Sequence, residues 1–266
     1  TGEPQSSRSS YGGMGVYRSQ DGGQNWQYMG LGDTNRIAKI LVDPKNSQRI
    51  FVAALGKLYS EGGQRGLYLS EDGGKNWQSV LDGDERTGII ALVQHPSQNN
   101  ILYAASWERE RTAWNFVEGG EGSAIWRSDD NGRSWQRLSG GFPSGKFVGR
   151  IGLAVSADSP DSVYAVVDNQ EPLPESEWEL GGHPLSAKRL RTMSKEEFLQ
   201  QDKDIIEQFI RNNDIHPDID ADKLITMLDN DELTLDALRD SLINANANLF
   251  NADIKGMELY LSLIHI

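Results

Sequence analysis

The chain has 266 residues, a formal net charge of −13 and 28 glycines, but no cysteine. This length suffices for one large domain, or for one domain with an insertion. The acidic balance argues against binding to nucleic acid or to an anionic membrane surface, because both partners attract clustered Lys and Arg. Without cysteine there is neither a disulfide framework nor a thiolate metal site, and no apolar run is long enough to span a membrane.

Short apolar runs separated by Asn, Asp, Ser and Gly indicate a turn-rich β protein. Pro44, Pro96 and Pro160 mark turns between pairs of these runs. In chain order, the predicted strands cover residues 16–18, 37–42, 50–55, 67–69, 89–93, 101–105, 125–127, 151–155 and 163–167.

A motif of the form S-x-D-x-G-x-x-W, here called the Asp box, follows three of these strands and predicts a hairpin turn. Short Ser and Asp side chains accept hydrogen bonds from N–H groups within a turn, Gly permits a positive φ, and Trp anchors the returning strand in the core. We therefore expect the three aspartates to be structural rather than catalytic. The motif residues are Ser19, Asp21, Gly23 and Trp26, then Ser70, Asp72, Gly74 and Trp77, then Ser128, Asp130, Gly132 and Trp135.

The three tryptophans recur at a spacing close to the ~40–50 residues of a four-stranded propeller blade. The strands between them give each blade the order A, B, C, Asp box, D. The sequence thus predicts an all-β fold over residues 1–170, an Asp-box β-propeller fragment with two full blades and two partial blades.

After Val167 the apolar spacing becomes helical. Ser194 and Glu197 match a capping box, and the apolar residues that follow predict a helix over about 194–212, with two shorter helices after it. We expect residues 171–250 to form an α-helical lobe inserted between strands B and C of one blade. Residues 251–266 then begin the next propeller strand, which is truncated, and we assign no function to 263–266.

Neither a metal nor a cofactor is expected. Asp218, Asp220 and Asp222, followed by Asp229, imitate a calcium loop, but Lys223 stands where that loop requires Gly, so helix capping is favoured. The four histidines are scattered, without the spacing of metal ligands. A partial dinucleotide fingerprint at 13–15 precedes a strand, although that motif requires a helix.

Three Asp boxes, the Asp43-Pro44 turn, the start Thr1-Gly-Glu3 and the run WERERTAWNF at 107–116 together resemble bacterial sortilin-like proteins with Asp-box (BNR) repeats. The resemblance covers nearly the whole chain. Such proteins are often labelled glycosyl hydrolases from the repeat alone, and some carry a helical lobe at this point. The resemblance implies an extracellular, periplasmic or cell-surface location.

In a propeller the Asp boxes share one face with the A–B turns, while the B–C and D–A loops occupy the opposite face, here called the long-loop face. Functional residues concentrate in such loops. The segments expected on the long-loop face are 1–12, 56–65, 82–88, 108–122, 139–149 and the helical lobe.

On this face the predicted ligand-binding residues are Trp107, Arg109, Arg111, Trp114 and Asn115. Planar cations beside aromatic surfaces suit carboxylates, sugars or peptide termini. In the alternative interpretation the arginines pair with nearby glutamates and the tryptophans fill gaps between blades. Both interpretations stay open, and no catalytic residue is assigned.

Three functions are compatible with these features. The first is an exported or surface propeller that binds peptide or glycan ligands through the long-loop face. The second is a glycoside hydrolase, sialidase-like or of another Asp-box type, with carboxylates partly in blades outside this chain. The third is a structural assembly platform whose helical lobe docks a protein partner.

Overall fold

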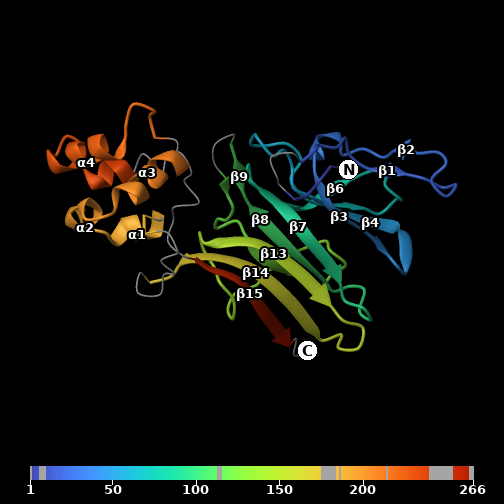
Figure 1. The fold of residues 1–266 in the computed structure, drawn as a ribbon. Helices are drawn as coiled ribbons and strands as arrows, with labels where there is room; N and C mark the ends of the chain where they lie inside the picture. Colours follow the sequence, from blue (N-terminus) through green and yellow to red (C-terminus); the bar gives the residue numbers. More distant parts are fainter. Residues whose placement is uncertain are drawn as a thin grey trace. The chain divides into compact units, whose positions relative to one another are not determined.

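The computed structural model describes residues 2–5, 10–112, 116–174, 184–185, 187–213 and 215–239, and the backbone of 254–263. The chain divides into two compact units. One, here called the β unit, comprises residues 1–171 and 255–266, and the other is the helical lobe of 172–254. Figure 1 shows the sheets in the β unit and the helices in the lobe. The role of the lobe as an insertion between strands B and C stays a prediction.

Two four-stranded antiparallel sheets form the centre of the β unit. Within each sheet, long strands that follow one another along the chain are hydrogen-bonded neighbours, which is the meander topology of a propeller blade. The all-β fold class predicted from the sequence is therefore confirmed. The first sheet contains β3 (Ile37–Asp43), β4 (Asn46–Ala54), β5 (Gly66–Ser70) and β6 (Gln78–Asp82), and the second contains β7 (Thr87–Gln94), β8 (Leu102–Glu108), β11 (Ala124–Ser128) and β12 (Gln136–Arg137).

Smaller sheets flank these two along the chain. A 3-10 turn, η1 (Gly32–Thr34), leads into β3, and β15 is hydrogen-bonded beside β14 although the helical lobe separates the two strands in sequence. The remaining strands are the hairpin β1 (Tyr17–Arg18) and β2 (Gln27–Tyr28), the hairpin β9 (Glu110–Arg111) and β10 (Phe116–Val117), and the three-stranded sheet β13 (Val148–Val155), β14 (Ser162–Pro172) and β15 (Ile254–Leu263).

The sheets are held together by apolar side chains between consecutive blades. Phe51, Leu67 and Leu102 are completely buried in a cluster that joins the first four-stranded sheet to the second. Ile151 and Val167 are likewise buried in a cluster that joins the second sheet to β13 and β14. Full burial of each such side chain contributes on the order of 1.5–3 kcal/mol, so these contacts between blades stabilise the β unit.

The first strands of the three larger sheets, β3, β7 and β13, share an irregularity at the same place. The pairing register shifts between Ile37 and Lys39 in β3, between Ile89 and Ala91 in β7, and between Val148 and Ile151 in β13. An extra residue at such a point bends the strand and increases its twist. In all three strands the shift lies near the end that follows a D–A loop, and thus close to the long-loop face.

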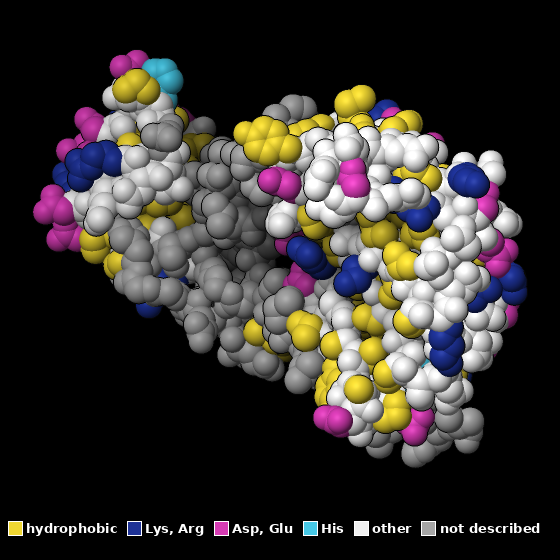
Figure 2. Space-filling view, turned by 90° about the vertical axis from the view of Figure 1, so that its right-hand side faces the viewer, with side chains coloured by type: hydrophobic (Ala, Val, Ile, Leu, Met, Phe, Trp, Pro, Cys, Tyr) yellow, Lys and Arg dark blue, Asp and Glu magenta, His cyan; other side chains and the backbone are white. Residues whose placement is uncertain are grey.

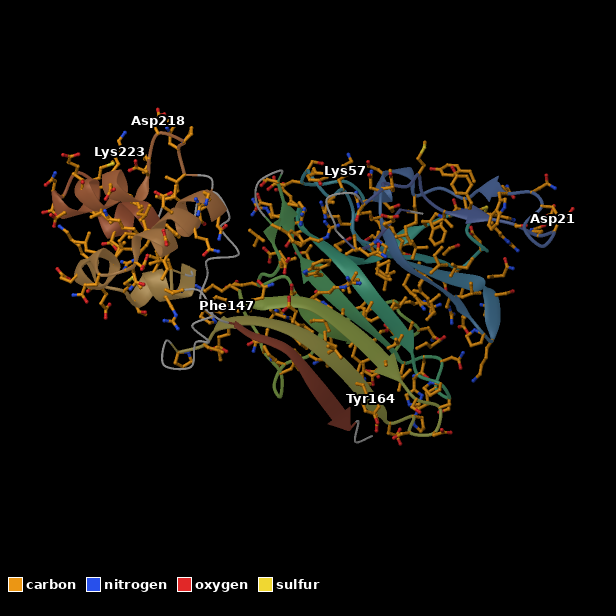
Figure 3. All side chains as sticks on the ribbon, in the orientation of Figure 1. Asp21, Lys57, Phe147, Tyr164, Asp218 and Lys223 are labelled. Atoms are coloured by element: carbon orange, nitrogen blue, oxygen red, sulfur yellow. The ribbon has the colours of Figure 1, made fainter. Side chains whose placement is uncertain are left out.

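The two ends of the blades can be followed in Figure 3. Phe147, directly before β13, and Tyr164, at the other end of the β13–β14 pair, lie at opposite ends of the third sheet. At the end marked by Tyr164 lie the A–B turns. The Asp boxes contact these turns: the N–H of Gly73 donates to the carbonyl of Gln48 over 2.9 Å, and the N–H of Asn131 donates to that of Asn100 over 3.0 Å.

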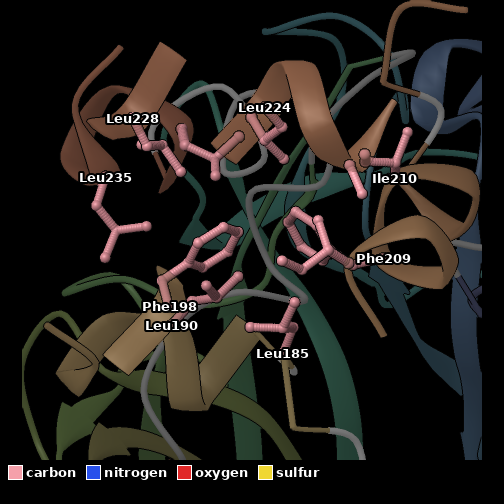
Figure 4. Packing of buried hydrophobic residues seen from close by; sticks show 11 residues of the cluster. Leu185, Leu190, Phe198, Phe209, Ile210, Leu224, Leu228 and Leu235 are labelled. Atoms are coloured by element: carbon pink, nitrogen blue, oxygen red, sulfur yellow. The ribbon is translucent and has the colours of Figure 1, made fainter. Parts of the chain in front are cut away.

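The helical lobe has a separate apolar core. Phe198 and Phe209 meet edge to face with ring centroids 6.3 Å apart, and Leu190, Leu224 and Leu228 surround them (Figure 4). The helices that carry these residues are α1 (Ala187–Thr192), α2 (Lys195–Leu199), α3 (Lys203–Asn212) and α4 (Ala221–Asp229).

The prediction of one continuous helix over 194–212 is wrong. The capping box of Ser194 and Glu197 starts α2, but this helix ends at Leu199. Asp202 has an extended backbone, and its carboxylate accepts a hydrogen bond from the N–H of Asp204, so it begins a new helix at Lys203. The periodicity of apolar residues continues through this break because both helices face the same core.

Candidate functional site

The three Asp boxes share one hydrogen-bond pattern. In the third, the hydroxyl of Ser128 donates to Asp130 over 2.8 Å and accepts from the N–H of Gly132 over 2.9 Å. The carboxylate of Asp130 accepts from the N–H groups of Arg133 and Ser134 over 3.0 and 2.9 Å. The same serine-to-glycine and aspartate-to-backbone bonds recur in the boxes of Asp21 and Asp72.

These bonds change the acidity of the aspartates. Hydrogen bonds from Asn25 lower the pKa of Asp21 from 3.8 to about 2, and hydrogen bonds from Asn76 do the same for Asp72. Burial opposes the change at Asp130, but bonds from Ser134 and Ser128 still lower its pKa to about 2. Each carboxylate thus stays ionised at neutral pH and is occupied within its own turn. Such groups suit turn capping, not proton transfer.

The tryptophans of the Asp boxes differ in their surroundings. The indole N–H of Trp77 donates to the carbonyl of Met29 over 2.6 Å, and Met29 belongs to the preceding blade. Trp135 packs against the cluster around Phe51, also in the preceding blade. Trp26 is 63% exposed, and within the described residues no sheet precedes its own. Trp77 and Trp135 therefore join their turns to the previous blade, while the indole N–H groups of Trp26 and Trp135 donate to the glycine carbonyl of their own box.

The long-loop face carries a pocket of about 140 Å³. Three of its segments supply the lining, and four of the lining residues are arginines: Arg65, Arg86, Arg109 and Arg111. Three glutamates, Glu61, Glu85 and Glu110, line the pocket as well. Of the five predicted ligand-binding residues, Arg109 and Arg111 therefore line one pocket.

Arg109 is buried without an acidic partner among the described residues. Its side chain is 3% exposed, one Nη donates to the carbonyl of Leu55 over 3.3 Å, and its Nε has no hydrogen-bond partner in the described part of the chain. Burial, together with the charges of Arg65 and Arg36, lowers the pKa of Arg109 from 12.5 to about 9. A buried cation in such a setting is costly unless an anion compensates it.

Arg65 is also buried, at 5% exposure, but its donors are occupied. It donates to the carbonyls of Leu55, Lys57, Ser60 and Gly62 over 2.5–2.9 Å and so holds the β4–β5 loop in shape. Gly56, with φ +73, makes room for it, because a Cβ there would lie 2.4 Å from the Cγ of Arg65.

A third buried arginine, Arg36, lies nearby. It is 4% exposed, its backbone carbonyl accepts from the N–H of Leu55, and one Nη donates to the carbonyl of Ser10 over 2.9 Å. Its Nε also has no partner within the described residues. The backbone of Leu55 thus contacts all three arginines: the backbone of Arg36 and the guanidinium groups of Arg65 and Arg109.

At the mouth of the pocket, Arg86 bridges two acids. Its guanidinium lies 2.8 Å from Glu61 and 2.8 Å from Glu110. Arg111 lies with its guanidinium 4.5 Å from the centre of the Phe116 ring, across the β9–β10 hairpin. The pocket therefore combines Arg109, a buried cation without an acidic partner in the described part of the chain, with paired charges closer to solvent.

Trp107 belongs to the core between blades. It is 3% exposed, its indole N–H donates to the carbonyl of Glu118 over 2.7 Å, and it packs with Phe116. The guanidinium groups of Arg109 and Arg150 lie 5.5 and 5.6 Å from its ring centre. The buried ring of Trp107 thus packs against the guanidinium of Arg109. Trp114 and Asn115 lie outside the described residues.

The sequence reasoning missed Arg36, Arg65 and Arg86. All three directly precede a strand, and Arg109 directly follows one, so each sits where a strand meets the long-loop face. An Arg at these repeated positions, once the strands are aligned, is the signal that could have found them. The face drawn in Figure 2 shows Lys and Arg interspersed with acids and apolar side chains, so charge on the visible surface does not reveal this group.

A second polar group lies beside Trp107. The side-chain amide of Gln170 donates to Glu118 over 3.3 Å and to Asp168 over 3.0 Å. Burial, and then the charge of Asp168, raise the pKa of Glu118 above its ordinary value of 4.5. One carboxyl of this pair therefore ionises less readily than a free glutamate.

Antiparallel four-stranded blades, each closed by an Asp box that contacts the previous blade, define an Asp-box β-propeller type of protein. Residues 14–216 match the sequence model of the Sortilin-Vps10 family, described as sortilin, neurotensin receptor 3. The chain belongs to this family, in agreement with the resemblance drawn from the motifs.

A curated relative, the vacuolar protein sorting/targeting protein 10 of Colletotrichum graminicola, is 30% identical over 106 residues. The match covers 40% of this chain and 6% of that protein, so the chain spans a small part of its relative. Among solved structures, an ancestral GH74 enzyme is similar with a TM-score of 0.46 and 25% identity over 60% of this chain and 20% of that one. The GH74 xyloglucanase of Xanthomonas campestris has a TM-score of 0.43 and 20% identity over 59% and 24%.

No helix among the described residues is both long and apolar enough to cross a membrane.

Proposed function

We propose that the chain is the ligand-binding portion of an exported or cell-surface propeller protein, which takes peptide or glycan ligands at the pocket on its long-loop face. The observation that carries the proposal is Arg109, a buried cation that lines the pocket and has no acidic partner among the described residues. Membership in a family described by sortilin, a receptor, supports binding as the activity and a lumenal or extracellular location.

The pocket suits recognition rather than bond breaking. Arginine and glutamate side chains make up most of the lining, and two of the glutamates, Glu61 and Glu110, are held in ion pairs with Arg86. Planar guanidinium groups bind carboxylates and sugar hydroxyls through charge-assisted, often bidentate hydrogen bonds.

A test on peptide and glycan arrays compares the wild type with Arg111→Ala. Arg111 is half-buried and lines the pocket, so its loss should weaken retention by about 2 kcal/mol, or roughly 30-fold, while thermal melting changes little. Arg133→Ala is the matched control, since this exposed arginine lies in an Asp box on the opposite face. Equal retention by both variants, or no retained ligand at all, would refute binding at this pocket.

Glycoside hydrolysis is a second candidate, favoured by the pair of Glu118 and Asp168. Both carboxylates accept a hydrogen bond from the same amide of Gln170, so the two acids lie close together, and glycosidases also use a pair of neighbouring carboxyls. The raised pKa of Glu118 is the property of a general acid. Release of reducing sugar from a panel of neutral and acidic polysaccharides, abolished by Glu118→Gln, would support hydrolysis, and its absence would exclude these two residues.

A further inference from the structure

The loop between β6 and β7 contributes to two separate cavities. Glu85 and Arg86 line the arginine-rich pocket described above. Asp82 at the end of β6, together with Gly83 and Asp84, lines a second one of about 290 Å³, here called the interblade cavity. The interblade cavity has about twice the volume of the pocket, and the two share none of the described residues. A role of the interblade cavity therefore goes beyond the proposed function and does not depend on it.

The floor of the interblade cavity is apolar. Leu81 of the first four-stranded sheet and Ile89 of the second line it, and both are buried in the cluster that joins these sheets. Trp126 of β11 also lines the cavity and packs against the same cluster. Its indole N–H donates to the hydroxyl of Ser106 over 2.9 Å. The polar group of the indole is thus occupied, so the ring offers an apolar contact to an entering side chain.

The rim of the interblade cavity is negatively charged. Asp82 and Asp84 are exposed there, and none of the described lining residues is a Lys or an Arg. Burial raises the pKa of Asp84, but hydrogen bonds from the N–H groups of Arg86 and Thr87, with the charge of Arg65, bring it below its ordinary value of 3.8. Asp84 therefore stays ionised at neutral pH, and the rim attracts a cation.

Thr87 adds a hydrogen-bonding group without a partner. It lines the cavity and is 5% exposed, and its hydroxyl has no hydrogen-bond partner in the described part of the chain. The hydroxyl faces Gly122, another lining residue, because a Cβ added to this glycine would collide with the Oγ1 of Thr87. A buried polar group without a partner is costly, so this hydroxyl points to a ligand group that donates to it.

We propose that the interblade cavity docks an extended segment of a partner protein in which one large aliphatic side chain is flanked by Lys or Arg. The aliphatic side chain packs on the apolar floor, the flanking cations lie against Asp82 and Asp84, and a backbone N–H of the segment donates to the hydroxyl of Thr87. Charge complementarity selects this occupant, because the rim repels an acidic segment and a neutral sugar leaves its charge unbalanced.

The binding assay uses fluorescence anisotropy of a labelled pentapeptide with leucine between two lysines. The peptide is acetylated and amidated, so it carries no terminal charge. We expect saturable binding that weakens with added sodium chloride, because the charges of the rim are exposed. Replacing the leucine by alanine should weaken binding by about tenfold or more. Replacing both lysines by glutamine should weaken it by about fivefold.

Variants with altered charge locate the peptide at the rim. Asp82→Lys reverses one exposed charge and should weaken binding roughly tenfold. Asp158→Lys is the matched control, because Asp158 is equally exposed but lies in the turn between β13 and β14, at the opposite end of the blades. If Asp82→Lys does not fold, Asp82→Asn removes the charge and keeps the acceptor that the hydroxyl of Ser79 uses, and it should weaken binding about threefold.

Thr87→Val tests the hydroxyl separately from the charges. It should weaken binding about fivefold, while its melting temperature equals or exceeds that of the wild type, because the hydroxyl that it removes has no partner within the described residues. Arg111→Ala changes only the arginine-rich pocket, so it should bind the pentapeptide like the wild type. Failure of the proposed function and failure of the docking site are therefore distinguishable.

The indole N–H signal of Trp126 in the NMR spectrum, assigned by its loss in Trp126→Phe, reports the position of the peptide. It should shift on addition of the pentapeptide, whereas the signal of Trp26, in an Asp box, should not. The docking site would be overturned by a peptide that shows no saturable binding, by equal affinity of Asp82→Lys and Asp158→Lys, or by a Trp126 signal that does not move. A neutral oligosaccharide that shifts this signal when the peptide does not would assign the cavity to a sugar and overturn the site as well.

Discussion

Replacing Asp130 tests the third Asp box, in which Asn131 accepts a hydrogen bond from Arg49 of the previous blade. Its carboxylate accepts hydrogen bonds from the hydroxyl and N–H of Ser134, from the N–H of Arg133 and from the hydroxyl of Ser128. The change in pKa from 3.8 to about 2 corresponds to a ceiling of ~2 kcal/mol of stability from the ionised form. Arg133 and Ser134 are exposed, so water replaces part of what is lost. We therefore expect Asp130→Ala to lower the free energy of unfolding by about 1–2 kcal/mol.

The contribution of Asp130 to stability should also depend on pH in a defined direction. The pKa of Asp130 is depressed in the folded chain, so its contribution is complete above about pH 4 and is lost as the pH falls toward about 2. The difference in unfolding free energy between the wild type and Asp130→Asn, measured by denaturant titration, should shrink across this window. Asp129→Ala is the control, because the carboxylate of this exposed neighbour binds the side chain of Arg127 instead of the turn. It should cost about 0.5 kcal/mol or less.

Two results would refute the structural account of the box. One is an equal loss of stability in Asp129→Ala and Asp130→Ala. The other is a loss of binding or hydrolytic activity in Asp130→Asn while its unfolding free energy matches the wild type, since the carboxylate would then act on a ligand and not on its turn.

Three further predictions concern other parts of the chain. Asp43→Ala should lower the unfolding free energy by about 3 kcal/mol, because Arg49, 3.1 Å away and largely buried, loses its buried counter-charge and keeps only the half-exposed Glu71 at 3.5 Å; a loss below about 1 kcal/mol in denaturant titration would contradict this. Glu118→Gln should stabilise the chain at neutral pH but not in acid. The reason is that a carboxyl whose pKa is raised in the folded chain destabilises the fold once the pH exceeds the pKa that it has in the unfolded chain. A variant that is less stable than the wild type at neutral pH would refute this prediction. Phe198→Ala should lower the stability of the helical lobe by about 3–5 kcal/mol, because it empties a buried position in the core of the lobe. Hydrogen-exchange protection of β7 and β8 should stay unchanged, and reduced protection there would show that the two units unfold together.

The sheets were predictable from the sequence because their determinants are local. Alternating apolar runs, turn prolines and three copies of one hairpin motif each act over a few residues, and the meander then follows from short connections. The break between α2 and α3 was not predicted, because the apolar spacing continues through it and only the extended backbone of Asp202 separates the helices.

The candidate site was predicted only in part, since its chemistry depends on burial and on partners from distant positions. The sequence places Arg109 in a long loop, but does not show that this residue is buried beside Arg65 and Arg36. Trp107 illustrates the same limit, because an aromatic residue near the end of a strand can equally face solvent or fill a core. Which of the two occurs depends on the neighbouring blade, which approaches closely: a Cβ on Gly88 would lie 2.6 Å from the carbonyl oxygen of Ala54.

The second and third Asp boxes contact the blade that precedes them, and these contacts affect how such repeats can be exchanged or extended. A Cβ on Gly132 would lie 2.4 Å from the ring of Phe51 in the previous blade, and Arg49 of that blade donates to Asn131 over 3.0 Å. One box earlier, Arg18 donates to the carbonyl of Gly73 over 3.2 Å. The interchangeable module is therefore staggered: it runs from the middle strands of one blade to the hairpin of the next. Recombination cut at blade boundaries would separate each hairpin from the surface it fits, whereas cuts within the blades would move both together.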